Sequence, residues 1–163
     1  MPVTPTISSS RGELPPRVVV ADDDMDLREL IALMLRSRGF DVVVASNGDA
    51  ALAAILSDGA DGLVSDFQMP GLNGLTLSRV LRGLRDYAVL PIVVFTGLGE
   101  ADPRLIPLRA IPELRILHND RHWIRGGNGS RTCARCIRDR GCLTELSDPR
   151  HSSAAPPHRE VIG

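Results

Sequence analysis

The chain has 163 residues, is 43% hydrophobic and carries a formal net charge of -1, which suits one ordinary α/β or α-rich domain with tails. No apolar run approaches the roughly 18 residues of a membrane span. Residues 1–16 lack the hydrophobic centre of a secretory signal and are expected to form a flexible leader. Three cysteines, an odd number, without such a signal favour a reducing, cytoplasmic location over a disulfide scaffold.

Residues 17–96 alternate between short β-branched runs and segments with apolar residues at helical spacing. Asp24 can cap the first helix, which begins near Met25, and Gly39 and Gly59 stand where the first two helices should end. We expect strands at residues 18–21, 40–45, 62–65 and 91–95, a helix at 49–57, and a third helix marked by Leu77, Val80, Leu81 and Leu84.

The pattern weakens after Thr96. Residues 101–110 have helical character, but Pro103 and Pro107 interrupt it, and residues 113–117 are a candidate fifth strand. From residue 121 on there is no apolar stripe, and the segment holds 8 Arg against 4 acidic residues, whereas residues 17–120 hold 10 Arg against 15. We therefore expect a domain over residues 17–120 and a basic, disordered tail at 121–163. The loss of periodicity after about residue 107 indicates divergence or a shifted reading frame.

Strands that alternate with helices predict a parallel sheet, and nearly all-apolar strands predict that both of its faces are covered. In such folds chemistry collects beyond the carboxyl ends of the strands. The polar residues at those ends are Asp22 and Asp23, Ser46, Asp66 and Thr96.

Asp22, Asp23 and Asp66 should therefore converge from two strands. Clustered carboxylates need a compensating cation, and hard oxygen ligands suit Mg²⁺, which binds through one or two carboxylates together with phosphate oxygens. The simpler interpretation, helix caps at loop ends, fits Asp24 better than these three residues together.

The segments VVVADDDMDLREL, LVSDFQMPGLNG and PIVVFTG strongly resemble the receiver domain of two-component response regulators over about residues 17–100. The resemblance implies a three-layer (βα)5 sandwich of the flavodoxin-like, CheY-like type, with the last βα unit uncertain. Pro70 and Gly74 match the turn of the loop after the third strand.

By the same resemblance, Asp22, Asp23 and Asp66 would hold Mg²⁺, with the backbone carbonyl of Gln68 completing the metal site. Asp66 would also be the residue that is phosphorylated. Thr96 would contact the new phosphoryl group. The implied partner is a sensor histidine kinase or a phosphotransfer protein. The implied chemistry is self-catalysed phosphotransfer and dephosphorylation at most, so we do not expect an enzyme.

The chain departs from this family in its last part. All 19 basic residues are Arg, so the lysine that the family places at the end of the fifth strand is missing. Arg115, His118 or Arg121 are candidates to replace it. Ile116 and Leu117 occupy the neighbourhood of the family's fifth-strand aromatic residue, and no fifth amphipathic helix is expected. These departures support an alternative, a degenerate receiver that binds proteins independently of phosphorylation.

Other functions find weaker support. Cys133 and Cys136 form a C-x-x-C pair, with Cys142, His122 and His151 as further candidate ligands, but the irregular spacing does not favour a structural zinc site. A basic tail can attract nucleic acid, yet only Trp123 is available for stacking and no helix-turn-helix pattern is visible. Haloacid-dehalogenase-like phosphatases need a second aspartate where this chain has Gln68.

Overall fold

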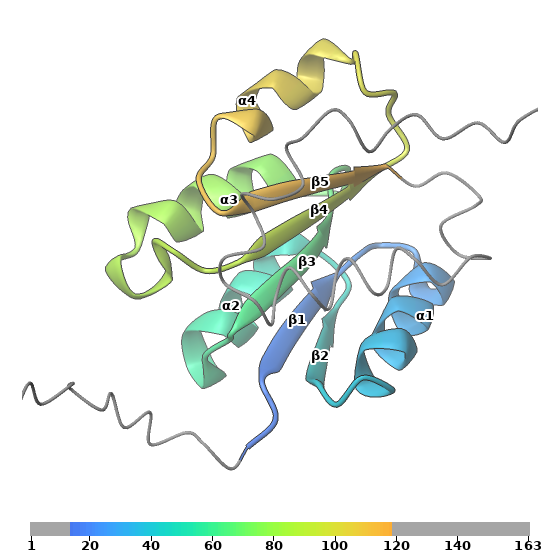
Figure 1. Ribbon diagram of the computed structural model, residues 1–163, viewed down its shortest axis with the longest axis vertical. Helices are drawn as coiled ribbons and strands as arrows, with labels where there is room; N and C mark the ends of the chain where they lie inside the picture. Colours follow the sequence, from blue (N-terminus) through green and yellow to red (C-terminus); the bar gives the residue numbers. More distant parts are fainter. Residues whose placement is uncertain (1–13, 119–163) are drawn as a thin grey trace, which may run out of the picture.

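The computed structural model describes residues 14–118, which form a single five-stranded parallel sheet with helices on both faces (Figure 1). The strands are β1 (Arg17–Ala21), β2 (Asp41–Ala45), β3 (Gly62–Asp66), β4 (Ile92–Thr96) and β5 (Leu114–His118). Their order in the sheet is β2-β1-β3-β4-β5. The order reverses between β1 and β3, so the carboxyl ends of these central strands flank a topological switch point. The expected flavodoxin-like fold is confirmed.

The three longer helices each begin at a side chain that satisfies a free backbone N–H group. Asp24 accepts from the amides of Asp26 and Leu27 at the start of α1, so its expected role as a cap is borne out. Asn47 and Asn73 do the same for α2 and α3. The helices are α1 (Met25–Arg36), α2 (Gly48–Asp58) and α3 (Gly74–Gly83). No helix within the described part of the chain is both long and apolar enough to cross a membrane.

The sheet carries a separate apolar cluster on each face. Val18, Val20 and Phe95 pack on the face covered by α1, together with Ile31 and Leu35. The other face packs against α2, α3 and the short helix α4 (Ile106–Arg109), which lies beside β5. Figure 1 shows α1 on one side of the sheet and α2 and α3 on the other. The central strands are therefore buried on both faces, as their apolar sequences predict.

The last part of the described chain differs in detail from expectation. The expected helix over residues 101–110 is reduced to a 3₁₀ turn, η2 (Pro103–Leu105), and the four-residue α4, because two prolines remove backbone donors. A second 3₁₀ turn, η1 (Arg85–Tyr87), precedes β4. β5 begins one residue later than expected and pairs with β4 over its whole length. The regular α/β pattern thus continues to His118; the predicted tail lies outside the described residues.

Gly74 lies where the backbone of α3 passes very close to the end of β3. A Cβ atom at this position would come within 2.4 Å of the carbonyl oxygen of Asp66 and 3.2 Å of the Cα atom of Phe67. The Gly74 amide donates to the Phe67 carbonyl at 3.2 Å. Any side chain here would therefore push the start of α3 away from the strand end that carries Asp66.

We expect Gly74→Ala to lower the free energy of unfolding by about 2–3 kcal/mol, because backbone atoms must shift to admit the methyl group. Gly83→Ala is the matched control, since a Cβ atom there meets nothing within 4 Å. It should be neutral or stabilise the helix by about 0.5–1 kcal/mol. Urea unfolding followed by circular dichroism measures both. Equal stability of the two variants would contradict the steric argument.

Candidate functional site

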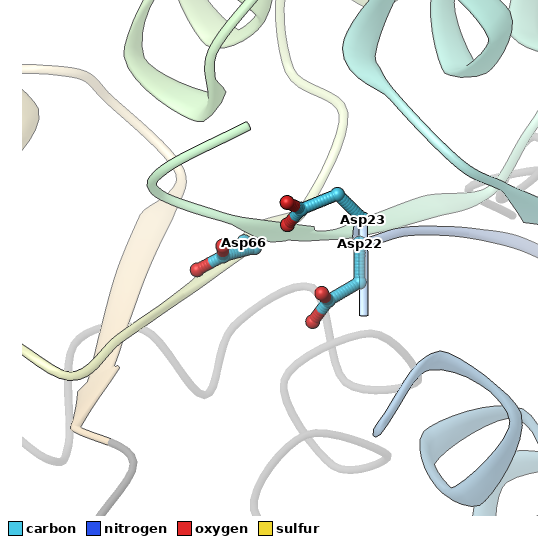
Figure 2. A group of neighbouring side chains, drawn as sticks. All are labelled: Asp22, Asp23 and Asp66. Atoms are coloured by element: carbon cyan, nitrogen blue, oxygen red, sulfur yellow. The ribbon is translucent and has the colours of Figure 1, made fainter. Parts of the chain in front are cut away.

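Three aspartates meet at the carboxyl edge of the sheet. Ala21 of β1 pairs with Ser65 of β3, so Asp22, which follows β1, lies level with Asp66, which ends β3. One carboxylate oxygen from each of Asp22, Asp23 and Asp66 lies within 4.8 Å of the others. Figure 2 shows the three side chains beside one another at this edge. The structure thus brings together the three carboxylates that strand ends alone predict to converge.

The three carboxylates differ in their surroundings. Asp22 is buried, with 2% of its surface exposed, whereas Asp23 is exposed and Asp66 is half-buried. Burial raises the pKa of Asp22 to about 6, against a hydrogen bond from the Asp24 amide and with help from the negative charges of Asp66, Asp23 and Asp24. Burial also raises the pKa of Asp66, which the charge of Asp23 reinforces; the amides of Gln68 and Phe67 oppose this shift.

This donor set fits a divalent cation. Carboxylate oxygens are the hard ligands that Mg²⁺ prefers, and three carboxylates this close together favour a compensating cation. The exposed side chain of Asp23 leaves one side of the cluster open to solvent. Gln68 follows Asp66 by two residues, with its amide on the Asp66 carboxylate; the expected metal contact of its carbonyl stays a prediction.

Thr96 ends β4 and is buried, with 1% of its surface exposed. Phe95, the residue before it, pairs with Asp66, so the threonine lies one position beyond the carboxylate at the same edge of the sheet. Its Oγ1 accepts a hydrogen bond from the Leu98 amide at 3.0 Å. Ser46, at the end of β2, is exposed and lies on the far side of β1 from Asp66.

The register of β5 shows which of the candidate replacements for the missing lysine ends at this edge of the sheet. His118 ends the strand and pairs with Thr96, whereas Arg115 pairs with Val93. Side chains alternate between the two faces of a strand, so Arg115, three residues earlier, points to the opposite face from His118. Ile116 and Leu117 pack in the core clusters on opposite faces of the sheet. Arg121 and the cysteines and histidines of the tail lie outside the described residues.

One contact of the site was not anticipated from the sequence. Arg28 of α1 donates from Nη1 to the backbone carbonyl of Asp22 at 2.6 Å. This bond ties the first turns of α1 to the residue that follows β1, and so fixes the backbone that carries two of the carboxylates. Its only sequence signal is that Arg28 is basic and lies one turn beyond the helix cap.

A doubly wound parallel sheet with three carboxylates at its switch point defines an α/β domain suited to binding a cation and phosphate. The family model described as response regulator receiver domain matches residues 18–108. That range is more than half of the chain and includes all three aspartates, Gln68 and Thr96. The chain belongs to this family.

Curated relatives include response regulators of Mycobacterium tuberculosis. The chain is 41% identical over 81 residues to the DNA-binding response regulator MtrA of Mycobacterium tuberculosis, covering 50% of this chain and 34% of the relative. It is 42% identical over 94 residues to response regulator MprA of the same species, covering 58% and 40%. The matches thus span well under half the length of these relatives.

Solved structures support the same fold. A putative response regulator from Chloroflexus aurantiacus superposes with a TM-score of 0.65 at 26% identity, covering 76% of this chain and 97% of that one. The receiver domain of sensor histidine kinase PA1611 from Pseudomonas aeruginosa, solved with a magnesium ion coordinated in its active-site cleft, gives 0.61 at 22% identity, covering 76% and 98%. At that identity the second likeness concerns the fold alone.

The raised pKa of Asp22 predicts an unusual pH dependence of stability without divalent cations. The folded state holds this proton more tightly than the unfolded chain, whose carboxyl has the usual pKa of 3.8. The contribution of the Asp22 proton to the free energy of unfolding is therefore fully present below about pH 4. It is lost as the pH rises through about 6, which lowers the free energy of unfolding by up to about 3 kcal/mol. Asp22→Asn should flatten this dependence and raise the free energy of unfolding at pH 7 by about 1–3 kcal/mol.

Chemical unfolding in EDTA at pH 4 and pH 7 measures the effect. Asp86→Asn is the control, because this exposed residue is not among the groups that raise the pKa of Asp22, and it should keep the pH dependence of the wild type. A wild type that becomes more stable between pH 4 and 7 by the same amount as Asp22→Asn would contradict the argument.

Proposed function

We propose that the chain accepts a phosphoryl group on Asp66 from a phosphohistidine of a sensor histidine kinase or phosphotransfer protein, in a Mg²⁺-dependent reaction. The observation that carries this proposal is the convergence of three carboxylate oxygens within 4.8 Å in a chain that belongs to the receiver family. The proposed setting is the cytoplasm.

In the proposed reaction, a carboxylate oxygen of Asp66 forms a bond to phosphorus while the bond from phosphorus to the histidine nitrogen breaks. The imidazole nitrogen leaves with the bonding electrons, and the product is an acyl phosphate. The amides of Phe67 and Gln68 hold the Asp66 carboxylate, which keeps one oxygen oriented for attack. Asp22, Asp23 and the Gln68 carbonyl would hold Mg²⁺, which supplies positive charge to offset that of the phosphoryl oxygens.

Thr96 is proposed to donate its hydroxyl hydrogen to an oxygen of the transferred phosphoryl group. Its position beside Asp66 at the end of β4 supports this role. The chain would undergo its own phosphorylation and hydrolysis, without turning over a separate substrate. It would therefore act as a signalling protein through contact with other proteins.

A second candidate is a degenerate receiver whose protein contacts do not depend on phosphate. Two observations favour it. The chain has no lysine, and the described β5 carries no aromatic residue. In that case the acidic cluster would bind a cation without accepting a phosphoryl group.

Incubation with acetyl phosphate and Mg²⁺, followed by a phosphate-affinity gel and intact mass, tests the proposal. We expect a shifted species in the wild type and in Asp86→Asn, an exposed control, and none in Asp66→Asn or after EDTA treatment. Hydroxylamine should remove the modification, because it cleaves acyl phosphates. The absence of a shift in the wild type would favour the degenerate receiver. A shift that persists in Asp66→Asn would exclude Asp66 as the acceptor.

A further inference from the structure

The peptide groups of Leu98 connect Thr96 to His118. The Leu98 amide donates to Thr96 Oγ1 at 3.0 Å, and the Leu98 carbonyl oxygen lies 2.7 Å from His118 Nδ1. A carbonyl oxygen can only accept, so Nδ1 must carry the proton of this bond. Two side chains at the ends of neighbouring strands are thereby joined through one residue.

The register of the strands makes this connection local. Thr96 and His118 are paired residues of the parallel strands β4 and β5, so their side chains leave the sheet on the same face. Leu98 lies two residues after Thr96, in the loop that follows β4. Its side chain packs at the edge of the cluster that faces α3, while its neighbours Gly97 and Gly99 have no side chains that could anchor the segment.

The next anchors of this segment lie farther along the chain. The Asp102 amide donates to the Gly99 carbonyl at 3.0 Å, and Arg109 donates to the carbonyl of Glu100. Neither bond constrains the peptide groups of Leu98 directly. Among these described hydrogen bonds, the one from His118, at the end of β5, is therefore the one that holds the Leu98 carbonyl.

The bond to Thr96 matters because a hydroxyl group has one hydrogen and two lone pairs. With the Leu98 amide on one lone pair, the hydroxyl hydrogen must point elsewhere. Because the Leu98 amide is itself a donor, the Thr96 hydroxyl cannot donate to it. This arrangement therefore leaves the Thr96 hydrogen available to a nearby acceptor.

We propose that His118 is a positioning residue for the phosphoacceptor site: its Nδ1–H holds the Leu98 peptide in the orientation that directs the Thr96 hydroxyl hydrogen toward an incoming phosphoryl group. The proposal rests on the proposed function of Asp66 and Thr96. It assigns to His118 a hydrogen-bonding role through Leu98, distinct from a direct charge contact with phosphate.

Two substitutions separate the two nitrogens of the ring. In His118→Asn the amide nitrogen can occupy the place of Nδ1, whereas in His118→Gln it lies near that of Nε2. Backbone amide hydrogen exchange of Leu98, measured by NMR on the metal-free full chain, reports the tether without any phosphorylation. We expect wild-type protection in His118→Asn and exchange faster by about 5–10-fold in His118→Gln and His118→Ala, the loss of one hydrogen bond. Equal exchange in all four proteins would overturn the tether.

The second measurement uses beryllofluoride with Mg²⁺ as a probe that imitates the phosphoryl group on Asp66. The apparent affinity should be within about twofold of wild type in His118→Asn and about 5-fold weaker in His118→Gln. In a Thr96→Val background, His118→Gln should cause no further loss, because the hydroxyl that it positions is gone.

Other outcomes show which part of the proposal is wrong. If His118→Gln binds the probe as the wild type does while His118→Asn is weakened, Nε2 acts directly and the positioning role is overturned. If affinity falls equally in both variants, or the loss persists in the Thr96→Val background, the role through Thr96 is overturned. If the wild type itself fails to bind the probe while the exchange results hold, the proposed function fails and the tether stands as a feature of the loop alone. Unfolding midpoints within error of wild type show that each variant is folded.

Discussion

The mutual repulsion of three carboxylates is the constraint around which this domain is organised. Two unit charges about 4 Å apart repel by about 4 kcal/mol at the effective dielectric typical of a protein surface. Asp22, Asp23 and Asp66 lie at comparable separations, and burial of Asp22 adds a desolvation cost. A proton, a cation or a change in the charge of one carboxylate relieves this repulsion. The site is therefore sensitive to the chemical events that a phosphoacceptor would have to sense.

The fold can hold this unfavourable arrangement because the strands that carry it are fixed on every side. β1 and β3 lie inside the sheet and have apolar clusters on both faces. At the opposite end of α3 from the site, Arg82 donates to four backbone carbonyls and so fixes the turns before β4 and β5. The accepting residues are Tyr87, Leu90, Pro112 and Glu113.

The parts of the molecule that the sequence predicts are those set by local chemistry. Apolar runs locate the strands, Asp24 caps its helix, and the rule that parallel strands end at one edge brings Asp66 to Asp22. The register of β5 was not predictable, since residues 97–113 contain no regular element long enough to fix the spacing to β4. Arg82 was missed for a different reason. In the sequence it is an ordinary helix arginine, and only the fold brings carbonyls from two distant turns around it.

The register of β5 changes how the missing lysine should be understood. An ammonium group would act on phosphate as a compact positive charge. His118 stands at the strand end next to Thr96, but one ring nitrogen is engaged with a backbone carbonyl. A ring held in this way fixes the Leu98 carbonyl relative to the end of β5. Under the proposed function, the groups that contact the metal and the phosphoryl group would come from β1, β3 and β4, while β5 would contribute indirectly, through the Leu98 peptide that orients Thr96.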